Sequence, residues 1–409
     1  MHKIERLLHT LAPKGVEFRK LGEVINILKG KQLNKELLLD YGEYPVMNGG
    51  IYASGYWNEY NTDCPKIIIS QGGASAGYVN YMTSKFWAGA HCYAIDLNSE
   101  KLNYKFLYYF LKNSQTILMK SQFGAGIPAL NKADIENLTI PIPPLEIQQE
   151  IVKILDAFTE LNTELNTELK ARKKQYEYYQ NMLLDFNDIN QNHKDAKERL
   201  AQKTYPKRLK TLLQTLAPKG VEFRKLGEVL EYDQPNQYCV TSKEFDKSYP
   251  TPVLTAGKTF ILGYTNEKDN IYQASKNAPV IIFDDFTTAT QWVDFPFKVK
   301  SSAMKILLPK NPTINIRFIF FYMQTIPYNI SGEHARHWIS RYSQLEVPIP
   351  PLEIQQEIVK ILDQFSALTT DLLAGIPAEI KARKKQYEYY REKLLAFKPL
   401  TPHKEVDKE

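Results

Sequence analysis

The stretch PIPPLEIQQEIVKILD, residues 141–156, occurs a second time without change at residues 348–363. Two further passages are also repeated. LLHTLAPKGVEFRKLGEV at 7–24 returns at 212–229 with His9 replaced by Gln214, and KARKKQYEYY at 170–179 returns at 381–390. Between these passages the two halves of the chain hardly match. A repeated frame around divergent inserts indicates one scaffold that is used twice to recognise two different things.

A long helix is expected after each proline step. In the first copy the seam residues recur at intervals of three and four, which indicates a heptad-like helix of about 40 residues, or roughly 60 Å at 1.5 Å per residue. Pro143 and Pro144 mark its start, since proline suits the first turn of a helix. Two separate core helices are the alternative, although helices this long rarely fit within a small globular core. The seam consists of Ile147, Ile151, Ile154, Phe158, Leu161, Leu165, Leu169, Arg172, Tyr176, Tyr179 and Leu183.

The seam of the second copy contains one additional step of four residues. An insertion of four is a stutter, which locally unwinds a coiled coil. Gly375 and Pro377 lie beside it, so a kink is expected there. The seam in this copy consists of Ile354, Ile358, Ile361, Phe365, Leu368, Leu372, Ile376, Ile380, Arg383, Tyr387, Tyr390 and Leu394.

The two inserts follow one plan despite their different sequences. KIIISQGG at 66–73 has the pattern of a buried strand that runs into a glycine-rich turn, and VIIFDDF at 280–286 occupies the same place. Residues 102–118 and 314–326 both carry apolar residues at helical spacing, and YPVMNGG at 44–50 corresponds to TPVLTAG at 251–257. We therefore expect two mixed α/β domains of similar fold, with different exposed loops.

Composition limits the class of protein. With 409 residues, 43% of them hydrophobic, the chain can hold two ordinary domains and extended elements. A net charge of +6 fits a polyanionic partner without demanding one. Cys64, Cys92 and Cys239 form neither a disulfide framework nor a zinc pattern. Neither a signal core nor an apolar run of membrane-spanning length occurs, so a soluble cytoplasmic protein is expected.

Sequence signatures of catalysis are absent from the places where they would be expected. Gly257, Lys258 and Thr259 resemble the end of a phosphate-binding loop, but Pro252 stands where that loop needs a glycine. Asp284 and Asp285 are an acidic pair without the further glutamate and lysine of a nuclease metal site. The histidines do not cluster at metal-ligand spacing. The sequence therefore predicts a protein that is not itself an enzyme and holds no metal.

Polar, aromatic and basic side chains gather in the parts of the inserts that differ most. Such side chains read base edges in the major groove of DNA, and lysine and arginine also hold phosphates. Ordinary solvated loops are the alternative for each residue taken singly. The candidate DNA-contacting residues are Ser70, Gln71, Ser75, Tyr78, Asn131, Lys132, Lys258, Thr259, Thr287, Thr288, Gln291, Trp292, Arg336, His337, Ser340 and Arg341.

A variable domain that ends in PIPPLEIQQEIVKILD and a long helix, all duplicated, resembles the specificity subunit of type I restriction–modification enzymes. The resemblance covers nearly the whole chain. It implies an α+β protein with an internal pseudo-twofold repeat, in which two long helices pack as an antiparallel coiled coil between two target recognition domains. Each domain would read one half of a split DNA target, and the helices would set the unspecified gap. The longer second helix, with its expected kink, is a departure from the family's pattern.

The same resemblance implies partners. Two modification subunits would methylate adenine, and restriction subunits would add translocation and cleavage, so S-adenosylmethionine, ATP and magnesium would belong to those subunits and no cofactor to this chain. The identical KARKKQYEYY passages suit docking of a modification subunit through Arg172, Lys173, Tyr176, Arg383, Lys384 and Tyr387. The solvated end of a helix pair is the alternative for these passages. A stand-alone DNA-binding regulator and an enzyme with a cryptic site are the rival functions.

A shorter repeat lies within the first helix. Residues 159–170 read TELN, TELN, TELK, and each unit adds about one helical turn, or roughly 6 Å. That length is on the order of one to two base-pair steps of DNA, so these units are candidates for a ruler between half-sites. A helix-favouring stretch of low complexity is the alternative.

These observations predict an order of segments along the chain. The first recognition domain spans 1–143 and its spacer helix 144–186. A polar linker at 187–210 follows, with a short helix near 195–202. The second recognition domain spans 211–350, its spacer helix 351–397, and a polar tail 398–409.

Overall fold

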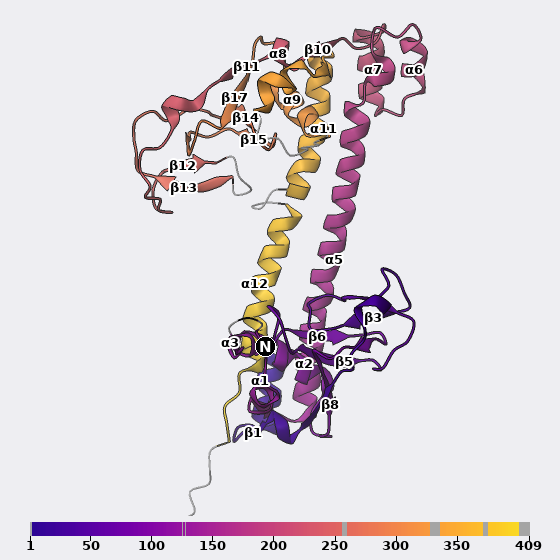
Figure 1. Cartoon of the computed structure of the whole chain (residues 1–409), viewed down its shortest axis with the longest axis vertical. Coiled ribbons are helices and arrows are strands. Elements are labelled where there is room, and N and C mark those ends of the chain that lie inside the picture. The colour runs from indigo at the N-terminus through magenta and orange to yellow at the C-terminus, as the bar shows by residue number, and fades with distance from the viewer. Residues whose placement is uncertain are drawn as a thin grey trace, which may run out of the picture. The chain divides into compact units, whose positions relative to one another are not determined.

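A computed structural model describes residues 2–124, 126, 128–255, 260–327, 336–370 and 375–400 of the chain (Figure 1). The contacts divide the chain into two compact units. Unit 1 combines Met1–Asn166 with Glu379–Glu409, and unit 2 is Thr167–Ala378. Each unit thus contains one insert, the first part of one spacer helix and the last part of the other. This arrangement follows the antiparallel pairing of the spacer helices.

Unit 1 is built on a four-stranded antiparallel sheet in the order β2-β8-β5-β6. A three-stranded sheet β4-β3-β7 and the pair β1-β9 complete it. The strands are β1 (Glu17–Lys20), β2 (Ile25–Lys29), β3 (Tyr44–Met47), β4 (Gly55–Trp57), β5 (Lys66–Ser70), β6 (Val79–Met82), β7 (Trp87–Ala88), β8 (Cys92–Leu97) and β9 (Thr139–Ile142).

Unit 2 repeats this topology strand for strand, in the orders β11-β17-β14-β15, β13-β12-β16 and β10-β18. In both three-stranded sheets the middle strand pairs antiparallel with one neighbour and parallel with the other. The strands are β10 (Phe223–Lys225), β11 (Leu230–Asp233), β12 (Thr251–Leu254), β13 (Ile261–Thr265), β14 (Val280–Asp284), β15 (Thr290–Val293), β16 (Lys298–Val299), β17 (Met304–Pro309) and β18 (Glu346–Pro348).

Helices cover the sheets and form the spacers. The short 3-10 turns are η1 (Leu21–Glu23), η2 (Lys35–Leu37), η3 (Asn187–Ile189), η4 (Pro235–Tyr238) and η5 (Tyr342–Gln344). The α-helices are α1 (His2–Leu11), α2 (Tyr104–Asn113), α3 (Gln115–Lys120), α4 (Lys132–Glu136), α5 (Leu145–Leu184), α6 (Ala196–Gln202), α7 (Lys207–Leu216), α8 (Leu226–Val229), α9 (Ile316–Met323), α10 (His337–Ser340), α11 (Leu352–Thr370) and α12 (Ile376–Leu395).

The predicted correspondence of the inserts is confirmed. The two predicted buried strands are β5 and β14, which are central strands with nearly every side chain buried. The two stretches at helical spacing contain α2 and α9, which begin after Asn103 and Asn315 respectively. The side-chain oxygen of each asparagine accepts hydrogen bonds from two backbone amides of its helix and so caps the N-terminus. The prediction of two mixed domains of similar fold is therefore confirmed.

A buried glutamine explains why the first passage of the spacer helix is repeated. The side chain of Gln148 is fully buried; its oxygen accepts the amide of Asn103, and its nitrogen donates to the carbonyls of Lys101 and Pro143. Gln355 makes the equivalent bonds with Asn315, Thr313 and Pro350. Because every polar atom of this amide is used, each glutamine joins the start of a spacer helix to the cap of the insert's helix. We call these two residues the clamp glutamines.

The first spacer helix has the predicted length of 40 residues. Its buried stripe begins with Ile147 and Ile151 as predicted and continues through Leu155, which the seam missed. Near its start the stripe therefore turns toward the insert, while Phe158 faces the other helix and stacks on Tyr390 with ring centroids 5.5 Å apart. In unit 2 the equivalent rings of Phe365 and Tyr179 stack at 4.9 Å.

These ring pairs show that the helices run antiparallel within each unit, because the start of one helix meets the end of the other. Figure 1 shows α5 beside α12 in unit 1 and beside α11 in unit 2. The second spacer is described as two helices of 19 and 20 residues. The kink was predicted beside Gly375 and Pro377, where α12 begins, and residues 371–374 between the two helices lie outside the described residues. A Cβ atom on Gly375 would stand 2.5 Å from the carbonyl oxygen of Ala367, so α12 begins close to the end of α11.

The segment expected to be a polar linker, 187–210, is packed instead. The predicted short helix is present as α6, and Ile189, Leu200 and Tyr205 lie in the core of unit 2. Three isolated apolar residues lack a period, which is why the sequence pattern concealed their burial. Backbone bonds connect this segment with Val221, whose amide donates to the carbonyl of Ile189 at 2.8 Å.

Residues 398–400, the described part of the predicted polar tail, make the equivalent contact in unit 1. The amide of Val16 donates to the carbonyl of Lys398 at 3.0 Å, and the amide of Leu400 donates back to Val16. Gly15 precedes this bridge with a φ of 109°, and a Cβ atom on it would stand 2.6 Å from a backbone oxygen. Gly220 shows the same geometry in unit 2. The repeated KGV sequence is therefore explained by a close approach of two backbones.

None of the helices in the described ranges combines the length and the apolar character that a membrane crossing requires.

Candidate nucleic-acid interface

The loop after β14 in unit 2 is closed by Asp284, the last residue of that strand. Its carboxylate accepts the amide of Phe286 at 2.9 Å and the hydroxyl of Thr287, and its backbone carbonyl accepts the amide of Thr288 at 2.8 Å. Thr288 is buried, with a left-handed φ of 56°. Phe286 and Thr287 are exposed. The loop therefore presents these two side chains to solvent in a defined shape.

A second segment of the same insert, 336–341, lies against this loop. The amides of His337 and Trp338 donate to the backbone carbonyl and the carboxylate of Asp285, both at 2.9 Å. The Trp338 ring also packs edge-on against Phe283, with centroids 5.2 Å apart. Helix α10 thus buries His337 and Trp338 in the unit. Its exposed side carries Arg336, Ile339, Ser340 and Arg341.

In unit 1 the loop after β5 uses its own hydroxyls. Ser70 is buried and donates to the carbonyl of Gly49, and Ser75 donates to the same oxygen at 2.6 Å. Both hydroxyl groups of this loop therefore shape it. The side-chain Oε1 of Gln71 is buried without a hydrogen-bond partner among the described residues.

The segment that precedes β9 in unit 1 lies against this loop, as α10 does in unit 2. The amide of Leu130 donates to the carbonyl of Gln71 at 2.8 Å. Asn131 then caps α4 through a reciprocal pair of bonds with the helix, in which Asp134 accepts the amide of Asn131. Asn131 and Lys132 are exposed, and Lys132 lies 3.2 Å from Glu136. An exposed lysine–glutamate ion pair of this kind leaves the ammonium group accessible to a phosphate.

Tyr78 and Trp292 are both held by cations of their own units. The ammonium of Lys112 lies 4.0 Å from the centre of the Tyr78 ring. Burial, assisted by the charge of Arg391, lowers the pKa of Lys112 to about 8. The guanidinium of Arg317 lies 4.5 Å from the Trp292 ring and forms an ion pair with Asp363 at 2.8 Å. Trp292 therefore packs against α9 rather than toward solvent.

The structure thus divides the predicted DNA-contacting residues into groups. It brings Thr287 and Thr288 together with the segment 336–341, and Ser70, Gln71 and Ser75 together with Asn131. Gln291 is exposed on β15, and Lys258 and Thr259 lie outside the described residues. Those with exposed side chains are Asn131, Lys132, Thr287, Gln291, Arg336, Ser340 and Arg341.

Two exposed side chains in the same places were missed at the level of sequence. Phe286 is 39% exposed at the loop tip, and Ile339 is 60% exposed on α10. Each lies beside polar residues that were selected as candidates for DNA contact. An apolar residue in such a position was itself a signal of a candidate DNA contact, because apolar side chains contact the thymine methyl group.

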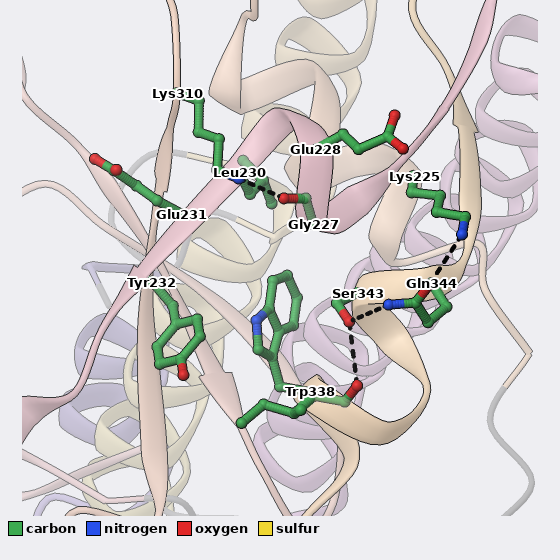
Figure 2. A pocket seen from close by; sticks show the side chains of 11 residues that line it. Lys225, Gly227, Glu228, Leu230, Glu231, Tyr232, Lys310, Trp338, Ser343 and Gln344 are labelled. Carbon is green, nitrogen blue, oxygen red and sulfur yellow. Dashed lines mark hydrogen bonds between the residues drawn. The ribbon is translucent and has the colours of Figure 1, made fainter.

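A hollow of about 630 Å³ adjoins α10 in unit 2, lined on one side by the repeated frame. Figure 2 shows Trp338 and Tyr232 among its lining residues, with Lys310 bonded to the carbonyl of Gly227 at 2.6 Å. Lys225 similarly donates to Gln344 at 3.1 Å. Glu228 and Glu231 also line the hollow, and this mixture of charges does not favour a phosphate. The exposed loops are therefore better candidates for the interface than the hollow is.

Within the part of the chain that the structure describes, no three His, Cys, Asp or Glu side chains are grouped so as to hold a metal ion. The predicted acidic pair is used internally: Asp284 closes its loop, and Asp285 lies 3.5 Å from Lys305.

The family model for the type I restriction modification DNA specificity domain matches the chain twice, at residues 13–174 and 218–382. The chain belongs to this family. Both matches include an insert and much of the spacer helix that follows it. The predicted resemblance to type I specificity subunits is thereby confirmed, and nothing in the comparisons supports the rival of a stand-alone regulator.

Named relatives agree with this assignment. The specificity subunit of the type I restriction enzyme EcoR124I/EcoR124II of Escherichia coli is 54% identical over 188 residues, which cover 44% of this chain and 45% of that protein. A putative type I restriction enzyme specificity subunit of Haemophilus influenzae is 31% identical over 93% of this chain and 96% of its own length. The crystal structure of a type I S subunit from M. genitalium has a TM-score of 0.62 at 20% identity and covers 93% of this chain and 96% of that one. That structure shares the fold.

In this specificity-family chain the repeated KARKKQYEYY passages have an inner and an outer side. Tyr176 is half-buried against the core of unit 2, where burial raises its pKa, and Tyr387 packs near Phe158 in unit 1. Arg172 and Arg383 each lie 3.5 Å from a glutamate one turn earlier. Lys173 and Lys384 are exposed. So are Tyr178 and Tyr389, at 61% and 57%, which the sequence interpretation did not select.

Proposed function

We propose that this chain is the DNA-reading subunit of a type I restriction–modification complex, in which each unit reads one half of a split target. One observation carries the proposal. The two units repeat the same sheets, caps and clamp glutamines, yet expose different side chains at the ends of their central strands. A common frame with different polar and basic loops suits the recognition of two different base sequences.

The spacer helices would set the distance between the two half-sites. Two reading units on one spacer raise the effective concentration of the second unit at its half-site, provided that the gap fits. Adenine methylation would be performed by two modification subunits that bind S-adenosylmethionine, and cleavage by restriction subunits that use ATP and magnesium. In this scheme the chain itself supplies no catalytic group and no cofactor.

The test is reconstitution of the chain with modification subunits of its own type I system. Chain and subunits together should methylate adenines in DNA within one sequence made of two specified parts and a fixed gap, as read by mapping of methylated bases. The chain alone should neither transfer methyl groups nor cleave DNA. Activity of the single chain, or methylation without a two-part sequence, would contradict the proposal.

We further propose that the modification subunits dock on the outer side of the repeated helix passages, formed by Lys173 and Tyr178 in one copy and Lys384 and Tyr389 in the other. The inner tyrosines, Tyr176 and Tyr387, are engaged in the units' own packing. Exposed tyrosines at identical positions suit a partner that binds in two copies, and tyrosine is enriched among residues that dominate interfaces.

The variant Tyr178→Ala should weaken the binding of one modification subunit by about tenfold, and Tyr389→Ala the other, as measured by native mass spectrometry of the titrated complex. Tyr41→Ala is the control, because Tyr41 is 90% exposed but lies outside the repeated passages. Equal binding by all three variants would place docking elsewhere.

A further inference from the structure

The central sheets of the two units place different side chains at one equivalent pair of positions. In unit 1 the register pairs Ile69 with Tyr93, and Gln71 follows β5. In unit 2 it pairs Phe283 with Lys305, and Asp285 follows β14. Gln71 therefore corresponds to Asp285, and Tyr93 to Lys305. The backbone confirms this match, because the amides of Gln71 and Asp285 both donate to the residue just before the neighbouring strand.

We infer that Asp285 with Lys305 in unit 2, and Gln71 with Tyr93 in unit 1, are positioning residues for base reading. Each pair fixes the segment that leads into the spacer helix against the loop at the end of the central strand, so that loop and segment meet DNA as one surface. This inference rests on the proposed function and names the side chains that set its geometry. We call the four residues the positioning pairs.

The pair in unit 2 is ionic and buried. Asp285 is 1% exposed and Lys305 2% exposed, and their charged atoms are 3.5 Å apart. Lys305 also donates to Gln234 and lies 4.7 Å from the Tyr232 ring. A buried ion pair is weak as a source of stability, because desolvation opposes the attraction between the charges. Its presence at a loop end is better explained by what Asp285 holds in place.

Asp285 holds the start of α10. Its carboxylate accepts the amide of Trp338, and its backbone carbonyl accepts the amide of His337, both at 2.9 Å. Lys305 in turn fixes the carboxylate from the neighbouring strand. The exposed side chains of α10 therefore cannot shift relative to Phe286 and Thr287 without breaking these bonds.

The pair in unit 1 fixes its segment without charged groups. The backbone carbonyl of Gln71 accepts a hydrogen bond from the amide of Leu130 at 2.8 Å, and the hydroxyl of Tyr93 donates to the carbonyl of the same residue at 3.2 Å. The backbone amide that follows, on Asn131, is accepted by Asp134 of its own segment rather than by the strand end. The segment of unit 1 is thus fixed through the amide and the carbonyl of one residue, Leu130, and that of unit 2 through the amides of two residues, His337 and Trp338.

The decisive variant removes the ionic pair as a whole. Removing one partner of a buried ion pair leaves the other charge buried and unpaired, whereas replacing both partners together often changes the stability of the fold little. In Asp285→Ala/Lys305→Met the Trp338 amide loses its acceptor. The measured quantity is discrimination: the ratio of methylation rates, by the complex with its modification subunits, on the cognate duplex and on duplexes with one base changed in a given half-site.

We expect this double variant to lose about tenfold in discrimination within the half-site read by unit 2, the size of one imperfect base contact, with the other half-site unchanged. Asp285→Asn/Lys305→Gln keeps an oxygen acceptor for Trp338 and should restore most of the discrimination. Glu267→Gln/Lys298→Met removes another ion pair of unit 2, 2.7 Å apart and with a buried lysine, and should leave discrimination unaltered.

Tyr93→Phe extends the test to unit 1 and removes only one oxygen atom, so it does not depend on the folding of the double variant. Discrimination should fall in the half-site read by unit 1 alone. The inference is overturned if Tyr93→Phe or the folded double variant discriminates as the parent does, if both half-sites are affected equally, or if the Glu267/Lys298 control loses as much. A parent complex that methylates without any two-part preference would instead refute the proposed function.

Discussion

The loops at the ends of the two central strands differ in length and chemistry but close in the same way. In unit 1 the amide of Ser70 donates to Tyr78 across residues 71–77, and in unit 2 that of Asp284 donates to Ala289 across the shorter 285–288. Both loops end on a left-handed residue, Gly77 or Thr288. The difference teaches that backbone bonds and one turn conformation carry the common frame. Side chains and loop length are then free to vary.

The comparison predicts that an insert is an exchangeable reader. Exchange of residues 25–138 with those of another specificity subunit should replace one half of the methylated sequence completely and leave the other half and the gap unaltered. The exchange begins at Ile25 because β2 pairs with β8, so that a sheet is moved whole. Mapping of methylated adenines reads the outcome, and a change in both halves would show that the units are not independent.

The length of the spacer should be separable from both readers. Removal of residues 162–165 deletes four residues of α5, which turn about 400° and rise roughly 6 Å, so the helix keeps its seam. The gap should shorten by about one or two base pairs at 3.4 Å each, with both half-sites unchanged. Deletion of two residues should instead turn the seam by about 200° and impair assembly. A four-residue deletion that keeps the original gap would exclude these units as a ruler.

The clamp glutamines should stabilise their own units. Gln148→Ala leaves three hydrogen-bonding groups in the core of unit 1 without partners and should lower the free energy of unfolding by about 3 kcal/mol. Gln355→Ala should do the same in unit 2. Denaturant unfolding can follow each unit separately, since Trp57 and Trp87 lie in unit 1 and Trp292 and Trp338 in unit 2.

The exposed neighbours of the clamp glutamines, Gln149 and Gln356, give matched controls, and their replacement by alanine should change the free energy of unfolding little. Equal losses in a clamp variant and its neighbour would show that the buried amide has no special part in joining helix and insert.

The smallest expected effect is a loss of stability of unit 2 at acidic pH. Burial acts to raise the pKa of Glu267, but its hydrogen bonds with Lys298, Ser242 and Thr241 outweigh burial and lower the pKa to about 2. Because the folded-state pKa lies below the ordinary value of 4.5, ionised Glu267 stabilises unit 2 above about pH 4.5, and this contribution is lost as the pH falls toward 2. Glu267→Gln should therefore destabilise unit 2 at pH 6 more than at pH 3, as followed by unfolding of its tryptophans. An equal effect at both values would contradict the ionic role.

Some features were predictable because they are periodic or repeated. The 40-residue helix follows from seam residues at intervals of three and four, and β5 and β14 follow from uninterrupted runs of apolar residues. The glutamine of LEIQQEI was visible as part of a repeat, but its burial was not, because Gln148 and Gln149 are indistinguishable in sequence.

The candidate interface was predictable in its segments and not in its individual residues. Thr287 and Arg336 are exposed as reading residues must be, whereas Ser70, Thr288 and His337 are buried. Whether a polar side chain in a loop faces solvent depends on the bonds that close the loop, and those bonds come from distant residues such as Gly49.

By itself the sequence determined the duplicated plan, the long spacer helix and the family, because repeats and periods are local properties of a chain. Only the tertiary structure decided which half of each spacer belongs to which unit, and that residues 187–210 and 398–400 are packed parts of the two units. It alone decided that Asp285 meets Lys305 while Tyr93 meets the carbonyl of Leu130. These contacts join residues far apart in the chain, and no local pattern records which distant partner a buried polar group will find.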